Sequence, residues 1–457
     1  MTSLVIGFPG SFLAKSLFRA IILRMARSRN QVPLSTDADI VHFIGYLREI
    51  LSMTGTVTDP PPPRHFAYLL GFIIAVGPVS VDMYLPAFAQ IAQRFGVVVP
   101  QLTLASYFAG FAVGQLAQGL LSDRFGRRAP LGAGLLLYTL ASLGCAAAPD
   151  AAVFCVFRAL AAFGAAASIV IPRAMVRDLA DGTRAASLMS DVLLVMSVAP
   201  VLAPVLGSVI LMFTSWRMIF VLAALYGVAG LFLLVRYLPE TLEIGRRKRL
   251  GVASAMGLYL EVLGERSFLV HTCIGAFGMA ALFAYLAGAP GVLMGLDGLS
   301  TTAFGLVLAA LGVAMIGFFR INGWLVRRMG APFALQVGIG IWLLAGAVLC
   351  GLAWTAQTGA LEVFIALLVF SLGYSFIPSN SQVGALSHHA AHAATATSLM
   401  STFQYGAGAL AGVLIGAYSD GTARPMATII LGCALGAAGA AKLRPGGSAG
   451  LPTGCAS

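Results

Sequence analysis

The chain has 457 residues, of which 59% are hydrophobic and only 10% are charged, and its mean hydropathy is +0.91. A soluble domain of this length needs far more charged surface, so the composition excludes the soluble class and indicates a polytopic membrane protein. No ten-residue stretch alternates between apolar and polar residues, which argues against a β-barrel.

The segment before the first apolar run is basic and contains no stretch long enough to span a membrane. Its apolar stretch "SLVIGF" precedes its positive charges, which is the reverse of a signal peptide. Met53 opens "MTGTVTDPPPPRHF", a proline-rich leader directly before the first apolar run. We expect residues 1–63 to be an N-terminal extension, with translation starting at Met53. The alternative is a basic amphipathic segment that lies on the membrane.

Twelve apolar segments follow, each about as long as the roughly 20 residues that a spanning helix needs. We therefore predict an all-α membrane protein with twelve transmembrane helices. The expected spans are 66–89, 100–121, 129–148, 151–172, 186–212, 217–238, 267–290, 303–322, 332–354, 361–379, 396–418 and 424–441.

The distribution of positive charge sets the expected orientation. From Arg64 onward, lysine and arginine gather in alternate loops and in the tail, whereas the other loops hold only Arg94, Arg217 and Arg424. The basic loops should face the cytoplasm, which places both termini there. The net charge of +11 then reflects topology and requires no nucleic-acid partner.

The longest inner loop, about 239–266, contains "GRRKR" and divides the spans into six plus six. We expect a first half at 64–238, a cytoplasmic linker at 239–266, a second half at 267–441 and a cytoplasmic tail at 442–457. "GLLSDRFGRRAP" in the first half has a weaker counterpart, "GWLVRRMGAP", in the second. Both follow the second span of their half, and two six-helix repeats are typical of transporters that handle substrate at the repeat interface.

Two ionisable residues lie well inside the expected spans, Asp82 in the first and Arg158 in the fourth. Asp82 is roughly 24 Å above the cytoplasmic side and Arg158 roughly 10 Å below the outer side, at 1.5 Å per residue. In a core about 30 Å thick these levels nearly coincide, so an Asp82–Arg158 pair is expected. Intramembrane charges are costly and mark function, and such a pair suits proton coupling. The alternative is a hydrated Asp82 near Pro86 and an Arg158 that only packs.

Weaker candidates for a substrate cavity are Tyr84, Asp191, Gln404 and Tyr405. Each also has a plain structural explanation, as packing or as an interfacial position. His388, His389 and His392 fall in an expected cytoplasmic loop without a neighbouring acid or cysteine, so they are interpreted as solvated and no metal site is expected. The six cysteines contain no CxxC pair, which argues against a disulfide framework.

The loop "GLLSDRFGRR" resembles the signature loop of the major facilitator superfamily, G-x-L-[SA]-D-R-x-G-R-[RK], at every fixed position. The resemblance implies a conformational latch, in which the loop acid braces the two halves in the outward-open state. The residues that this assigns are Gly119, Asp123, Arg124, Gly126, Arg127 and Arg128. Gly126 also permits a tight turn, and the arginines also serve as positive-inside anchors.

Other segments, among them "VDMYLPAF", "IPRAMVRDL" and "YLPETL", resemble the bicyclomycin-resistance and chloramphenicol-efflux branch of drug:proton antiporters over about residues 64–440. The antiporter signature of the fifth span, G-P-x-x-G-G, is met here at Pro204 and Gly207, with Pro200 one turn earlier. Ala203 and Ser208 replace two of its glycines.

The resemblance implies efflux of small amphipathic drugs in exchange for protons, by alternating access of the two halves. A monomer is expected, whose partners are the bilayer, the small molecule and protons, with the proton gradient as energy source and no cofactor. No Walker loop, G-x-S-x-G elbow or H-E-x-x-H motif is present, so an enzyme is not indicated. The alternatives are a metabolite or amino-acid exporter of the same superfamily and a non-transporting membrane sensor or scaffold.

Overall fold

The computed structural model describes residues 65–180, 182–247, 252–355, 359–387 and 393–444. These residues form helices and contain no strand, and twelve of the helical segments are long and apolar enough to cross a membrane. The expected histidine cluster at 388–392, the N-terminal extension with Met53, and the tail beyond 444 lie outside the described residues.

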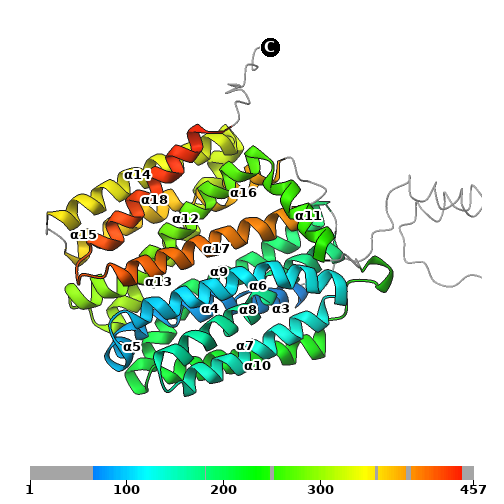
Figure 1. Ribbon diagram of the computed structural model, residues 1–457, viewed down its shortest axis with the longest axis horizontal. Helices are drawn as coiled ribbons and strands as arrows, with labels where there is room; N and C mark the ends of the chain where they lie inside the picture. The colour runs from blue at the N-terminus through cyan, green and yellow to red at the C-terminus, as the bar shows by residue number, and fades with distance from the viewer. Residues whose placement is uncertain (1–64, 181, 248–251, 356–358, 388–392, 445–457) are drawn as a thin grey trace, which may run out of the picture. The chain divides into compact units, whose positions relative to one another are not determined.

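The first half comprises six spans, from α3 to α10 (Figure 1). Its elements are α3 (His65–Ile74), α4 (Val76–Asp82), the 3₁₀ turn η1 (Leu85–Ala87), α5 (Phe88–Phe95), α6 (Val99–Phe125), α7 (Arg128–Ala147), α8 (Ala151–Leu179), α9 (Gly182–Phe213) and α10 (Arg217–Tyr237).

A linker and a second half of six spans follow. The linker contains η2 (Ile244–Arg246) and the helix α11 (Val252–Leu263), which the sequence alone did not predict. The second half comprises α12 (Arg266–Pro290), the π-helix η3 (Gly291–Leu296), α13 (Thr301–Met329), α14 (Ala331–Trp354), α15 (Ala360–Tyr374), α16 (Ile377–Leu386), α17 (Ala393–Ala417) and α18 (Arg424–Lys442).

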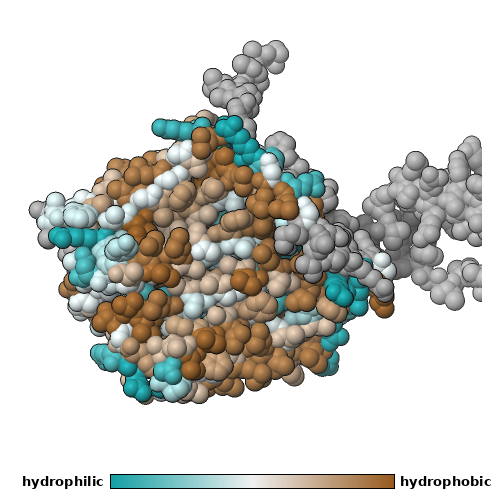
Figure 2. Space-filling model, in the orientation of Figure 1, coloured by the Kyte–Doolittle hydropathy of each residue, from teal (hydrophilic) through white to brown (hydrophobic). Residues whose placement is uncertain are grey.

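Apolar side chains cover most of the face seen in Figure 2, and polar side chains gather toward the margins where helices end. This is the pattern of a surface whose middle meets lipid and whose ends meet water. Several spans extend beyond their expected ends, since α8 reaches Leu179 and α9 begins at Gly182. Arg173 and Arg177, expected in a loop, therefore lie on α8.

Proline accounts for three breaks in the spans. A proline has no N–H to donate to the carbonyl four residues earlier, so a helix tends to end at that residue. Pro78, Pro86 and Pro378 come four residues after the last residues of α3, α4 and α15, which are Ile74, Asp82 and Tyr374. The break that follows Asp82 matters most, because it leaves the carbonyl of an intramembrane acid without its helical partner.

The two halves contact each other along α6 and α17 and along α9 and α13, and Figure 1 shows α6 beside α17. Small residues allow this approach. A side chain on Gly412 would meet Ala105, and one on Gly305 would meet Ser208 and the Pro204 carbonyl. At the end of the bundle opposite the signature loop, α5 also contacts η3, and η1 contacts α12 and α13.

Candidate functional site

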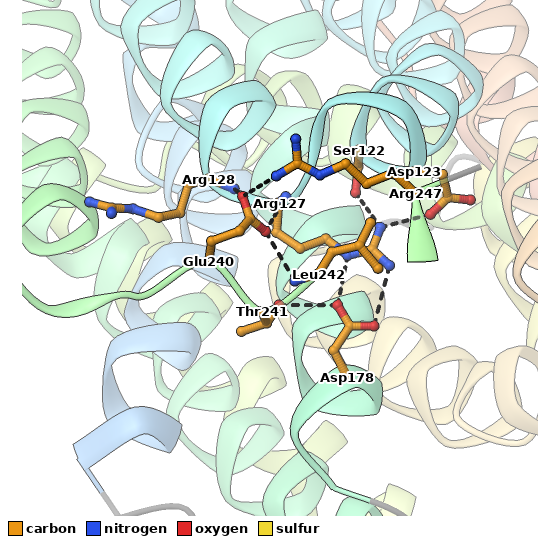
Figure 3. Close-up of polar contacts among 9 residues, drawn as sticks. All are labelled: Ser122, Asp123, Arg127, Arg128, Asp178, Glu240, Thr241, Leu242 and Arg247. Carbon is orange, nitrogen blue, oxygen red and sulfur yellow. Dashed lines mark hydrogen bonds and ion pairs between the residues drawn. The ribbon is translucent and has the colours of Figure 1, made fainter. Parts of the chain in front are cut away.

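The signature loop forms a polar network centred on the Arg127 guanidinium (Figure 3). Arg127 Nη1 donates to Ser122 Oγ at 2.6 Å and to Asp123 Oδ1 at 2.7 Å. Arg127 Nε donates to Asp178 Oδ2 at 2.8 Å, and Nη2 donates to Asp178 Oδ1 at 3.3 Å, which is a bidentate pair. Burial acts to lower the pKa of Arg127, but the hydrogen bonds to Asp178 and Asp123 outweigh it and raise the pKa.

A second carboxylate, Glu240 at the start of the linker, holds the backbone of the same loop. Its Oε1 accepts hydrogen bonds from the N–H groups of Arg127, at 2.7 Å, and Leu242, at 3.1 Å. Its Oε2 accepts from the N–H of Arg128 at 3.2 Å and lies 4.0 Å from Arg247 Nη2. Burial acts to raise the pKa of Glu240, but these backbone donors and Arg247 lower it below its usual range. Sequence reasoning missed Asp178 and Glu240, although "VRDL" and "YLPETL" contain them.

Among the described residues, the recorded ion pair of Asp123 is with Arg127 of its own loop, and no ion pair to the second half is recorded. Gly126 turns the chain at φ +92°, as expected for a glycine turn. A side chain on Gly119 would lie 3.4 Å from Ser398 Oγ of α17, so this glycine is at the junction of the halves. The Arg124 guanidinium lies over the Phe125 ring, and Arg128 donates to the Val235 carbonyl of α10 at 3.0 Å. The brace between halves implied for Asp123 thus stays a prediction for another conformation.

Arg158 is buried, with 2% of its surface exposed, inside the first half. Its guanidinium lies between the rings of Tyr84 and Tyr107, 4.5 and 4.4 Å from their centroids. Nη1 donates to the Ser80 carbonyl at 3.4 Å, whereas Nε and Nη2 have no hydrogen-bond partner in the part of the chain that the structure describes. A cavity with room for about one water molecule adjoins it. Cation–π contacts therefore supply most of the stabilisation of this buried charge.

The expected Asp82–Arg158 ion pair is not formed in this structure. Arg158 contacts the Ser80 carbonyl and the Tyr84 ring, which share one face of the first span. Asp82 is two residues after Ser80 on α4, a rotation of about 200°, so it projects from the opposite side of this helix. The half-buried Asp82 instead lies within electrostatic range of the Tyr285 hydroxyl on α12, in the second half. Among the described residues no hydrogen bond or ion pair is recorded for this carboxylate.

The fifth-span motif packs directly against the break that follows Asp82. A side chain on Gly207 would lie 2.2 Å from the Met83 carbonyl oxygen, so only glycine fits there without a shift. The carbonyl oxygens of Pro200 and Pro204 face Gly312 and Gly305 of α13. Ser208, which replaces a family glycine, donates to the Thr301 carbonyl at 3.0 Å. The motif therefore joins the Asp82 region to the second half.

The weaker candidates separate into two groups. Tyr84 is fully buried, and its hydroxyl bonds to Thr103, so it packs inside the first half and does not line an open cavity. Asp191 is exposed on α9. Gln404 and Tyr405 are half-buried on α17, and the Tyr405 ring packs 4.4 Å from the Phe111 ring of the first half. Of the four, Tyr405 stands at the interface between halves, whereas Gln404 lies against Gly275 of α12 in the second half.

Comparison with known proteins agrees with this architecture. The chain matches the Major Facilitator Superfamily over residues 70–412. It is 30% identical to an MFS-type transporter of Bacillus subtilis, over 80% of this chain and 91% of that one. It is 34% identical to a chloramphenicol resistance protein of Pseudomonas aeruginosa, over 67% of this chain and 73% of that protein. It is 29% identical to a bicyclomycin resistance protein homolog of Haemophilus influenzae, over 79% of this chain and 91% of that protein.

Solved structures share the fold. A bacterial homolog of the human lysosomal transporter Spinster, in an inward-facing and occupied conformation, superposes with a TM-score of 0.66 at 14% identity, over 84% of this chain and 97% of that one. A D-xylose–proton symporter superposes with a TM-score of 0.62 at 17% identity, over 81% of this chain and 95% of that one. Family and fold are those of membrane transporters, and a multi-pass bacterial membrane protein is thereby supported. The chain belongs to the major facilitator superfamily.

Proposed function

We propose that this transporter exports small amphipathic drugs across the inner membrane in exchange for protons, by alternating access of its two halves. Both termini lie in the cytoplasm, and the working unit is a monomer that needs no cofactor. Relatives that carry chloramphenicol and bicyclomycin resistance in their names support the substrate class. The distribution of arginine and lysine supports the orientation.

The observation that carries the proton-coupling proposal is the placement of Asp82. Its carboxylate has no recorded partner among the described residues, stands at a proline-induced break, and is near enough to α12 of the second half to interact electrostatically with Tyr285. An unpaired acid inside a membrane is costly, and broken helices at a repeat interface are typical of coupling sites in transporters. Rocking of the halves changes the surroundings of Asp82, which allows it to bind a proton on one side and release it on the other.

The experiment uses inverted membrane vesicles with a pH-sensitive fluorescent dye. Chloramphenicol should dissipate the proton gradient in vesicles with the wild-type protein. Asp82→Asn should abolish the response while its amount in the membrane is unchanged. Asp420→Asn is the matched control, because Asp420 lies in an exposed turn between α17 and α18 and should leave the response intact.

Two outcomes would contradict the proposal. A full response from Asp82→Asn would remove this residue from proton coupling. Silence of the wild-type protein toward a panel of drugs, together with a response to a metabolite or amino acid, would replace drug export by the export of that metabolite.

A further inference from the structure

We propose that a groove between α3 and α10 binds one anionic phospholipid, with an acyl chain in the groove and the phosphate at the basic end of α10. The groove has a volume of about 550 Å³ and lies within the first half, apart from the signature loop and from Asp82. Its lining residues are His65, Tyr68, Leu69, Phe72, Leu233 and Tyr237. The site is therefore separate from the parts of the protein that the export proposal uses.

The walls of the groove are one face of each helix. The four lining residues of α3 are separated by three, four or seven positions wherever they are not adjacent, so they share one face. On α10, Leu233 and Tyr237 are four residues apart and also share a face. Tyr226, seven residues before Leu233, lies on that same face. A largely aromatic face of α3 thus meets a largely aromatic face of α10.

Two stacked rings form the inner end of the groove. The ring centroids of Phe72 and Tyr226 lie 4.2 Å apart, with an angle of 15° between the ring planes. The Tyr226 hydroxyl donates to the Phe72 carbonyl at 2.7 Å, which holds the two helices together at this level. Phe72 is seven residues from His65, the first residue of α3, and hence roughly 10 Å from that end. The groove extends from the stacked rings toward the ends of the two helices.

The groove opens at the surface that meets lipid. Tyr68 and Tyr237, which line it, are 62% and 49% exposed. Phe232 and Val235 of α10 are exposed as well, and an exposed apolar side chain on a membrane span contacts acyl chains. A depth of roughly 10 Å stays within one leaflet, because half of a core about 30 Å thick is about 15 Å. The dimensions and the apolar lining therefore fit one lipid chain that enters from the end of the bundle.

Two guanidinium groups stand at the last turn of α10, beside the mouth of the groove. Arg236 Cζ lies 5.2 Å from the centroid of the Tyr237 ring, which lines the groove. Arg128 Nη2 donates to the Val235 carbonyl at 3.0 Å. Neither arginine side chain has an ion pair recorded in the part of the chain that the structure describes. A phosphate at this position supplies the anion, in charge-assisted hydrogen bonds.

The charge at the mouth selects an anionic lipid over a zwitterionic one. The cationic headgroup of a zwitterionic lipid offsets the attraction of its phosphate to the arginines, whereas an anionic lipid carries no such cation. In the orientation proposed above, this end of the bundle faces the cytoplasm, where the leaflet surface carries anionic lipid. Basic pockets between membrane helices on that side are typical binding sites for anionic headgroups.

The test uses native mass spectrometry of the purified full-length protein with phosphatidylglycerol and with zwitterionic phosphatidylcholine that has the same acyl chains. The wild-type protein should bind its first molecule of phosphatidylglycerol more tightly than that of phosphatidylcholine. Arg236→Gln should weaken phosphatidylglycerol binding about fivefold and leave phosphatidylcholine within about twofold, because the anionic lipid depends more on the charge. Leu233→Trp should weaken the binding of both lipids about tenfold, since the larger ring fills the groove.

Two control variants match these substitutions. Arg94 also lies over the next aromatic ring of its helix, with Cζ 5.5 Å from the Phe95 centroid, but it stands on α5 at the opposite end of the bundle. Leu225 is an exposed leucine of α10 that does not line the groove. Arg94→Gln and Leu225→Trp should therefore bind both lipids as the wild type does. Retained phosphatidylcholine binding shows that Arg236→Gln is folded.

Three outcomes would overturn the inference. The first is equal affinity of the wild-type protein for the two lipids, and the second is unchanged phosphatidylglycerol binding in Arg236→Gln. The third is lipid binding that appears only in a chain that starts at Met53, since residues 1–52 would then be the occupant of the groove. Because the measurement uses neither a drug nor a proton gradient, each of these outcomes leaves the export proposal intact.

Discussion

Replacement of Asp178 by alanine should destabilise the protein much more than replacement of Asp123, the acid of the signature loop. Both carboxylates bind Arg127, whose side chain is 8% exposed. Asp178 is 15% exposed and accepts three hydrogen bonds, two from Arg127 and one from Thr241 at 3.0 Å. Asp123 is 41% exposed and accepts one. We therefore expect Asp178 to contribute more to stability than Asp123.

The magnitudes follow from burial. A hydrogen bond to a charged group contributes about 1.5–3 kcal/mol, and loss of one partner of a buried pair costs about 3–5 kcal/mol. Asp123 and Ser122 still bind Arg127 in Asp178→Ala, so we expect a loss of about 2–3 kcal/mol. For Asp123→Ala, solvent screening limits the loss to about 0–1 kcal/mol. At about 2–4 °C per kcal/mol for large domains, a difference of about 2 kcal/mol separates the unfolding midpoints by about 4–8 °C.

In the assay, the purified variants are heated at a fixed rate in the same detergent, and their unfolding is measured by size-exclusion chromatography. Raising the salt concentration should reduce the small effect of Asp123→Ala more than that of Asp178→Ala, since salt screens exposed pairs more strongly. Equal midpoints for the two variants, or a lower midpoint for Asp123→Ala, would refute the assignment of the stabilising pair to Asp178.

Two further predictions concern packing and pH. Gly110→Ala should lower the unfolding midpoint by overpacking, at a cost of about 1–3 kcal/mol, because the new side chain would lie 2.1 Å from the Ala159 carbonyl oxygen. The control is Gly432→Ala, whose new side chain would meet nothing within 4 Å. Equal midpoints for the two variants would show that α6 and α8 are not packed so closely. The pKa of Glu240 is lowered by folding, so the stability that it contributes is present above its unfolded pKa of about 4.3 and is lost as the pH falls through its lower folded value. The wild-type midpoint should therefore fall more than that of Glu240→Gln between about pH 5 and pH 3, and parallel pH profiles would contradict this.

Much of the fold could be predicted because a membrane-spanning helix requires a long apolar segment, which is visible in the amino-acid sequence. Twelve apolar segments separated by short loops predicted the spans, and the signature loop identified the superfamily. Span ends were less well predicted, since α8 continues through "RAMVRDL" despite its charges. The linker helix α11 was missed because its apolar sequence is only 12 residues long, which is too short for a membrane span. Helix ends there depend on which polar groups find partners, such as Asp178 with Arg127 and Glu240 with the loop backbone.

The candidate site, like the fold, could be predicted from the sequence only in part. The sequence by itself determined that Asp82 and Arg158 are intramembrane charges at similar depth, because rise per residue along a helix is fixed. Only the tertiary structure decided that they face opposite ways, since the face that a helix presents to each neighbour depends on packing. Close contacts such as Gly207 with the Met83 carbonyl set that rotation, turning Ser80 and Tyr84 toward Arg158 and Asp82 toward the second half.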